Sequence, residues 1–154
     1  MKYSKTSAKL SLAICIFSVV ALVVTAATFP MFFKGLYFSY HDAATDTMLP
    51  ELLKIVVPAF YCCVPFAGAA LYMLIRLLLN IIKEKVFIKN NVGYLRYVSW
   101  CCYAVALITL IFGFKYPLLE MVMFTMAVVG TLLRVVKNIM QSAVEISEEN
   151  ELTI

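Results

Sequence analysis

Five cysteines carry thiols, which can act as nucleophiles, form disulfides or bind metal ions. They are therefore the first candidates for a reactive or metal-binding site. They are Cys15, Cys62, Cys63, Cys101 and Cys102. All five lie in apolar stretches without a CxxC spacing, whereas a zinc site brings about four nitrogen or sulfur ligands together. We interpret them as small apolar packing residues, with redox sensing or acylation of the two adjacent pairs as the alternative. Their odd number argues against a disulfide framework.

One polar loop holds the single histidine beside two aspartates. His41, Asp42 and Asp46 have side chains that could ligate a cation. Such a cluster in a polar loop is more often simply solvated, so we predict no metal site there. The sequence also offers no Ser/His/Asp set and no paired carboxylates within an apolar stretch. We therefore predict no catalytic residue, no cofactor and no enzymatic activity.

The composition indicates which solvent surrounds these residues. The chain has 154 residues, of which 64% are hydrophobic and 14% are charged, and its mean hydropathy is +0.93. A soluble domain is roughly half apolar and a quarter charged, and a domain of this size cannot bury such an excess. The sequence therefore predicts a single membrane domain over residues 1–154. The net charge of +4 then indicates topology and anionic lipid, with no direct binding of nucleic acid.

Four apolar stretches are long enough to cross a bilayer, which needs roughly 20 apolar residues. They cover about residues 10–33, 55–79, 98–114 and 118–136. The first also resembles a signal peptide, but it is longer than a usual signal core, and we interpret it as a retained anchor. Only Lys115, Tyr116 and Pro117 separate the last two spans, which predicts an antiparallel hairpin. The predicted fold class is all-α, an integral membrane bundle of four transmembrane helices.

The distribution of lysine and arginine predicts the orientation of the chain. Three basic residues precede the first span, five lie in or beside the central connection, and two lie at the tail; the first outer loop and the short turn together hold three. Because basic residues are retained on the cytoplasmic side, this split places both termini, the central loop 80–97 and the tail 137–154 in the cytoplasm. The even number of spans agrees with that orientation. The predicted location is the cell membrane.

The central loop 80–97 is the most distinctive polar segment. Its basic residues alternate with apolar ones, a pattern typical of a segment lying along lipid headgroups, where each basic residue contributes ~1 kcal/mol. Asn90, Asn91 and Gly93 indicate a turn followed by a helix start. Two interpretations remain open, a surface linker with positive-inside charge and a docking surface for a cytosolic protein.

The tail 137–154 changes sign, because its later charges are all glutamates. Its apolar residues have partial helical periodicity, so we predict that the fourth helix continues past the membrane and ends near Asn150. The acidic end could lie against the basic central loop, remain solvated, or contact a partner.

Two segments resemble a bacterial membrane family known only as domain of unknown function 2975. The first is the stretch from Val86 to Trp100, in which Phe87, Asn91, Leu95 and Arg96 follow the family's pattern. The second is the acidic close at the end of the chain, made by Glu148, Glu149, Glu151, Leu152, Thr153 and Ile154. The family often has a basic residue where this chain has Tyr94, which is a mild departure. The resemblance implies four helices, no established activity, and partnership with a small cytosolic helix-turn-helix transcriptional regulator.

These observations predict a multi-pass membrane protein that acts as a sensor or anchor with that regulator. The alternative is a small transporter or a protector against membrane-active peptides, which would have to work as a homo-oligomer. The residues predicted to contact a partner or lipid are Lys83, Lys85, Phe87, Lys89, Asn91, Leu95, Arg96, Glu148, Glu149, Glu151, Leu152 and Thr153.

Overall fold

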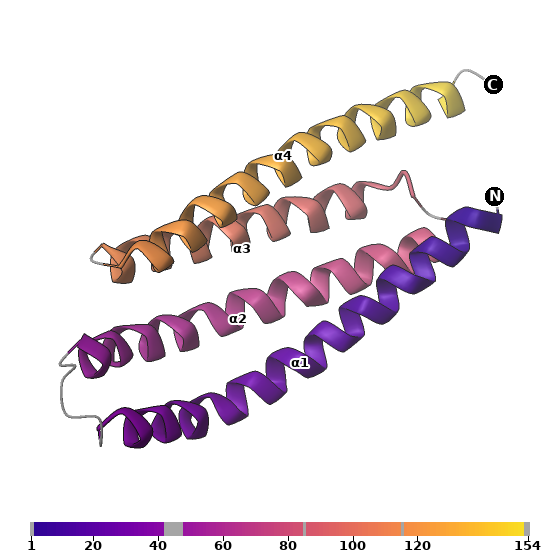
Figure 1. Cartoon of the computed structure of the whole chain (residues 1–154). Coiled ribbons are helices and arrows are strands. Elements are labelled where there is room, and N and C mark those ends of the chain that lie inside the picture. The colour runs from indigo at the N-terminus through magenta and orange to yellow at the C-terminus, as the bar shows by residue number, and fades with distance from the viewer. Residues whose placement is uncertain (1, 42–47, 85, 115, 153–154) are drawn as a thin grey trace.

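Four long helices make up the fold, as the apolar stretches predicted. The computed structural model describes residues 2–41, 48–84, 86–114 and 116–152. The helices are α1 (Lys2–His41), α2 (Met48–Ile82), α3 (Lys89–Gly113) and α4 (Pro117–Leu152). Successive helices run in opposite directions, so the amino and carboxyl ends lie at the same end of the molecule (Figure 1). We call this end the terminal end.

Each helix contains a segment that is long and apolar enough to cross a membrane. These segments are Thr6–Phe32, Lys54–Ile82, Lys89–Gly113 and Leu119–Glu149. Large apolar side chains on α1 and α4 are exposed, among them Phe17, Phe32 and Phe124. Water would not tolerate so much apolar surface, whereas lipid accepts it. The chain is therefore a multi-pass membrane protein.

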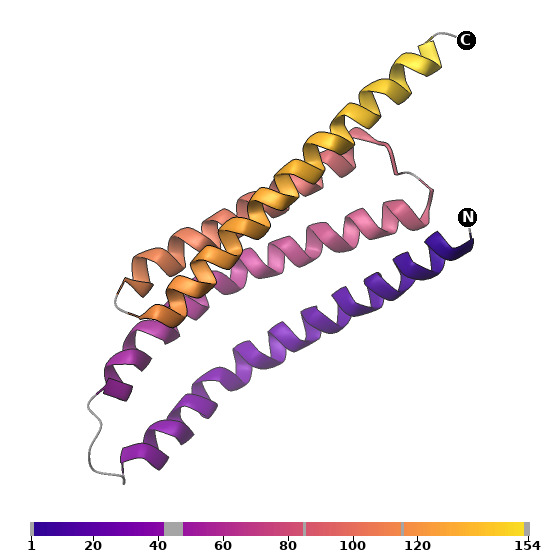
Figure 2. The same ribbon diagram turned by 45° about the horizontal axis from the view of Figure 1, so that its top comes forward.

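The helices pack in the order of the chain. α1 contacts α2, α2 contacts α3, and α3 contacts α4, and in the described part of the chain α1 touches neither α3 nor α4. Figure 1 shows this sequential arrangement, with α1 at one side and α4 at the other, and Figure 2 shows that α4 crosses α3 at an angle. α3 is flanked on two sides and carries most of the buried residues. These are Asn91, Val92, Leu95, Val98, Ser99, Ala106, Thr109 and Gly113.

The helices are longer than the apolar spans, which corrects two predicted boundaries. α2 continues to Ile82 and α3 already begins at Lys89, so the loop predicted over 80–97 is reduced to the residues between them. α1 continues through Pro30 to His41. A helix satisfies its own backbone hydrogen bonds, so it has no reason to stop where hydrocarbon ends. A proline costs one such bond and is tolerated in membrane helices.

The short connection between α3 and α4 closes the predicted antiparallel hairpin. The Tyr116 amide donates to the Gly113 carbonyl over 2.8 Å, and the Leu119 amide donates to the Tyr116 carbonyl over 3.0 Å. A Cβ atom on Gly113 would lie 2.6 Å from the Leu119 Cβ. Glycine is therefore required at this turn, because any side chain would meet the start of α4.

Further along the hairpin, α3 and α4 pack closely at Gly130. A Cβ atom there would lie 3.2 Å from the Tyr103 ring, 3.3 Å from the Cys102 Cβ and 3.4 Å from the Ser99 carbonyl oxygen. Small residues at a crossing let two membrane helices approach and gain van der Waals contact. The tight part of the α3–α4 interface therefore depends on the missing side chain of Gly130.

Aromatic side chains hold α1 against α2. The rings of Phe29 and Phe60 stack with their centroids 4.0 Å apart. The Tyr61 hydroxyl donates a hydrogen bond of 2.9 Å to the Ala26 carbonyl of α1. Ala59 of α2 is buried. Ring stacking and one hydrogen bond thus fix the outermost helix, which has no other neighbour in the described part of the chain.

Candidate functional site

A buried asparagine organises the connection between α2 and α3. The Asn91 side chain is 0% exposed. Its Nδ2 donates to the Val86 carbonyl over 2.8 Å, and its Oδ1 accepts from Asn80 Nδ2 over 2.7 Å. The carboxamide thereby joins the end of α2, the connecting residues and the first turn of α3. We call Asn80, Asn91 and the Val86 carbonyl the asparagine clamp.

The clamp corrects two of the predicted contact residues. Asn91 and Leu95 were expected to offer a surface to a partner or to lipid, but both are buried within the protein. A buried amide needs internal hydrogen-bond partners, and Asn91 finds them in the connection it closes. These two residues position their neighbours and do not themselves form the surface.

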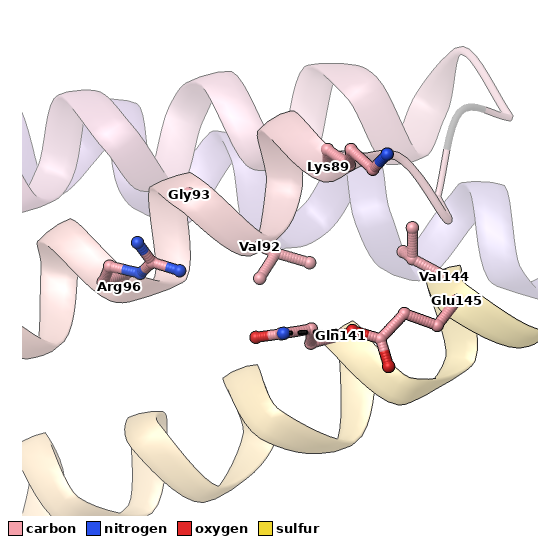
Figure 3. Close-up of a pocket in the computed structure, with 7 residues that line it drawn as sticks. All are labelled: Lys89, Val92, Gly93, Arg96, Gln141, Val144 and Glu145. Carbon is pink, nitrogen blue, oxygen red and sulfur yellow. Dashed lines mark hydrogen bonds between the residues drawn. The ribbon is translucent and has the colours of Figure 1, made fainter.

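The exposed neighbours line a groove between α3 and α4 at the terminal end (Figure 3). It has a volume of about 330 Å³. α3 contributes Lys89, Val92, Gly93 and Arg96, and α4 contributes Gln141, Val144 and Glu145. We call it the α3–α4 groove.

Helical spacing and one glycine explain why the groove exists. The α3 residues that line it recur at intervals of three or four, which places them on one face of the helix. Val92 and Val144 are buried and form an apolar floor. A Cβ atom on Gly93 would have nothing within 4 Å. Gly93 therefore leaves room between the two helices where most residues would fill it.

Charged groups surround this apolar floor. Lys89 Nζ lies 3.0 Å from Glu148 Oε2 in an exposed ion pair. Gln141 Nε2 donates to Glu145 Oε1 over 3.1 Å. The sequence left open whether the acidic tail lies against the basic segment, and the ion pair shows that Glu148 does. The arrangement can recognise a complementary surface by charge and by apolar contact.

Arg96 differs from the other charged residues of the groove. Its side chain is exposed, and within the described residues it has neither an ion-pair partner nor a hydrogen-bond acceptor. Guanidinium presents five N–H donors in a rigid plane suited to carboxylate and phosphate. Arg96 is thus the cation of the groove that is open to an incoming group.

The remaining predicted residues lie around the groove or outside the described residues. Lys83 and Phe87 are exposed in the connection, and Glu149 is exposed on α4. Glu151 and Leu152 belong to the last turn of α4. Lys85 and Thr153 lie outside the described residues, as do Asp42 and Asp46 of the outer loop. All five cysteines are free thiols.

Sequence reasoning missed five groove residues as parts of a site. They are Val92, Gly93, Gln141, Val144 and Glu145. The predicted hairpin could have identified them. Residues at similar distances from a tight turn lie opposite each other in an antiparallel pair, so the basic start of α3 had to face the acidic end of α4.

Comparison with known proteins gives a family and nothing closer. The model of a family described as "Protein of unknown function (DUF2975)" matches residues 4–154. Neither the curated proteins nor the solved structures include a match to this chain.

Proposed function

Because the chain belongs to DUF2975, a family of proteins of unknown function, we propose a role for it from the geometry of the α3–α4 groove. The protein is a non-enzymatic membrane anchor or sensor that docks a cytosolic regulator. The observation that carries this proposal is the position of the groove. It joins an apolar floor to opposed charges at the terminal end, where the exposed polar residues of α3 and α4 also gather.

The chemistry of the groove favours a protein partner. Val92 and Val144 supply apolar contact area, while Arg96 and Glu145 carry opposite charges on facing helices. Such surfaces bind by apolar contact and gain specificity from charge complementarity. The resemblance noted from the sequence implies a helix-turn-helix transcriptional regulator, and we take such a protein as the partner.

The distribution of basic residues supports a cytoplasmic location for the groove. The lysines at the start of α1 and the basic residues around the α2–α3 connection all belong to the terminal end (Figure 1). The positive-inside rule assigns such an end to the cytoplasm. We therefore propose the bacterial cell membrane as the location, with both termini and the groove in the cytoplasm.

The choice of docking over transport rests on where charges lie. Transport pathways depend on polar or ionisable groups at membrane depth. Glu120 lies in the first turn of α4, and Arg76 lies near the end of α2, where its guanidinium is 5.6 Å from the Tyr72 ring centre. These positions favour the boundaries of the membrane over its middle.

Site-specific photo-crosslinking in native membranes tests the proposal. A photo-reactive side chain replaces Gly93, where a Cβ atom would have nothing within 4 Å. A second chain carries it in place of Glu120 at the opposite end of the hairpin. We expect a helix-turn-helix regulator to be crosslinked from position 93 alone.

Charge reversal at Arg96 provides the second arm. Arg96→Glu is expected to remove the crosslink while the chain remains in the membrane at its normal level. Equal crosslinking from positions 93 and 120, or an undiminished crosslink in Arg96→Glu, would contradict docking in the groove.

A further inference from the structure

A second arginine on the α3–α4 hairpin is held in a defined orientation by aromatic rings. The Arg134 guanidinium carbon lies 5.1 Å from the centre of the Trp100 ring and 5.9 Å from that of Tyr103. The Tyr103 hydroxyl and Thr131 Oγ1 are 3.1 Å apart and share a hydrogen bond. Trp100 and Tyr103 meet edge to face with centroids 6.2 Å apart. We call Trp100, Tyr103, Thr131 and Arg134 the arginine cluster.

The stacking leaves the donors of Arg134 available. A guanidinium that contacts rings through its face keeps its N–H groups at its edges. In the described part of the chain the Arg134 side chain has ring contacts but no hydrogen bond or ion pair. The side chains of Arg134 and Trp100 are both exposed. The cluster is therefore a preoriented donor group on the lipid-facing side of the hairpin.

Positive charge surrounds the cluster without a compensating carboxylate. Arg96 lies one helical turn from Trp100 on the same face of α3, and Lys137 lies one turn beyond Arg134 on α4. The sequence of α3 contains no acidic residue, and that of α4 contains none between Glu120 and Glu145. An anionic group at Arg134 would meet attraction from three cations, while Glu145, the next acidic residue of α4 toward the terminal end, lies eleven positions further along the helix.

The depth of the cluster determines which anion can reach it. Trp100 is the single tryptophan of the chain, and tryptophan in membrane proteins gathers at the level of the lipid headgroups. Arg134 is seven residues inside Gln141, the first groove residue of α4, in a stretch with exposed apolar side chains on both sides. A phosphate at this depth is most readily one that is attached to acyl chains.

We propose that the arginine cluster, together with Arg96, binds the phosphate of an anionic phospholipid headgroup. The edge of the Arg134 guanidinium donates to the phosphate oxygens, the Trp100 and Tyr103 rings fix the plane of that guanidinium, and Arg96 adds charge from α3. The acyl chains lie along the exposed apolar surface below the cluster. This lipid site shares Arg96 with the α3–α4 groove, but Trp100 fluorescence measures it with no partner protein present.

Trp100 makes the site directly measurable, because no other tryptophan contributes fluorescence. The full chain is reconstituted in vesicles of phosphatidylglycerol and phosphatidylcholine. In one preparation only the phosphatidylglycerol is brominated, and in the other only the phosphatidylcholine is brominated. The ratio of quenching by the two brominated lipids gives their relative association constant at Trp100. We expect about a fivefold preference for the anionic lipid, which is equivalent to about 1 kcal/mol in total.

Substitutions show which residues cause the preference for the anionic lipid. Arg134→Gln and Arg96→Gln should each bring the ratio close to one, while Arg134→Lys, which keeps charge but loses the planar fork, should give an intermediate value. Lys9→Gln removes the same charge from α1, which does not contact α3 or α4 in the described residues, and should leave the ratio unchanged. Taking a ratio cancels any direct effect of a substitution on Trp100 emission.

Three results would overturn the assignment. The first is a ratio of one in the unsubstituted protein. The second is an undiminished ratio in both Arg134→Gln and Arg96→Gln. The third is displacement of the brominated anionic lipid by millimolar glycerol phosphate, which would show that the cluster takes a soluble phosphate and not a lipid. Retained quenching in the presence of glycerol phosphate supports the lipid site.

Discussion

The Asn80 side-chain amide donates a hydrogen bond of 2.7 Å to the Asn91 side-chain oxygen. This bond joins two helices across the connection that carries much of the polar character of the chain. Because Asn91 is fully buried and also donates to Val86, it fixes where α3 begins. The start of α3 in turn positions Lys89 and Arg96 at the groove.

Replacing the clamp residue should destabilise the protein. Asn91→Ala removes both hydrogen bonds and leaves the Asn80 amide and the Val86 carbonyl without this partner, at a cost of about 1–3 kcal/mol for buried polar groups. Thermal unfolding in detergent, followed by circular dichroism, measures the loss. Asn90→Ala alters the exposed neighbour and should have little effect. A melting temperature as high in Asn91→Ala as in Asn90→Ala would show that the clamp is not structural.

Adding one methyl group at the hairpin crossing should separate α3 from α4. In Gly130→Ala the new carbon would lie 3.2 Å from the Tyr103 ring and 3.4 Å from the Ser99 carbonyl oxygen, so the helices must move apart. We expect a lower melting temperature, with overpacking costing about 1–3 kcal/mol.

The matched control for this substitution is another glycine inside a helix. A Cβ atom on Gly68 would have nothing within 4 Å, so Gly68→Ala should be neutral or stabilise the protein by up to about 1 kcal/mol through helix propensity. The changes in melting temperature caused by Gly130→Ala and Gly68→Ala should therefore differ in sign or clearly in size. Equal melting temperatures would refute a close crossing at Gly130.

The hydrogen bond between α1 and α2 should make a small contribution. Tyr61→Phe removes the donor to the Ala26 carbonyl, which is 2.9 Å away, and interhelical hydrogen bonds in membranes average about 0.6 kcal/mol. The ring stacking of Phe29 and Phe60 remains in this variant. Its stability can be compared with that of Tyr97→Phe, which alters an exposed tyrosine on α3. A loss of several kcal/mol in Tyr61→Phe alone would mean that this one bond holds α1.

The ion pair at the rim of the groove should matter little for stability. The side chains of Lys89 and Glu148 are 76% and 48% exposed, and exposed pairs contribute about 0–1 kcal/mol. Lys89→Gln and Glu148→Gln should each change the melting temperature only slightly, and less still at high salt because of screening. Reversing both charges together should restore any stability that the single variants lose. A large, salt-independent loss in one variant would show that the pair is buried in the native membrane.

The sequence was sufficient to predict the four helices, but it was not sufficient to predict the contacts between them. Hydrophobic length predicted four spans, because crossing hydrocarbon requires about 20 apolar residues whatever their neighbours. The turn formed by Lys115, Tyr116 and Pro117 predicted the hairpin, because a tight turn forces adjacent helices to be antiparallel. α1 extends beyond the predicted span to His41, and α3 begins earlier than predicted, at Lys89, since the turn-forming residues around Asn90 are accommodated within it.

The function of individual polar residues was the part that required the structure. Asn91 belonged to a basic, polar segment and was therefore expected at the surface, yet its side chain is buried. The contact between Arg134 and the ring of Trp100 was not predicted from the sequence. Contacts of this kind depend on the rotation of one helix against another, which small residues such as Gly130 allow and which no single helix encodes.

Composition and apolar length alone thus determined that this chain is a four-helix membrane protein, because the transfer of side chains into lipid is additive and local. The distribution of lysine and arginine adds a predicted orientation by the same kind of counting. Only the tertiary structure decided that Asn91 joins α2 to α3 and that Arg134 stacks on Trp100. It also decided that Val92 and Val144 form the floor of a groove. Those features arise from pairs of residues far apart in the chain, and packing geometry selects which pairs meet.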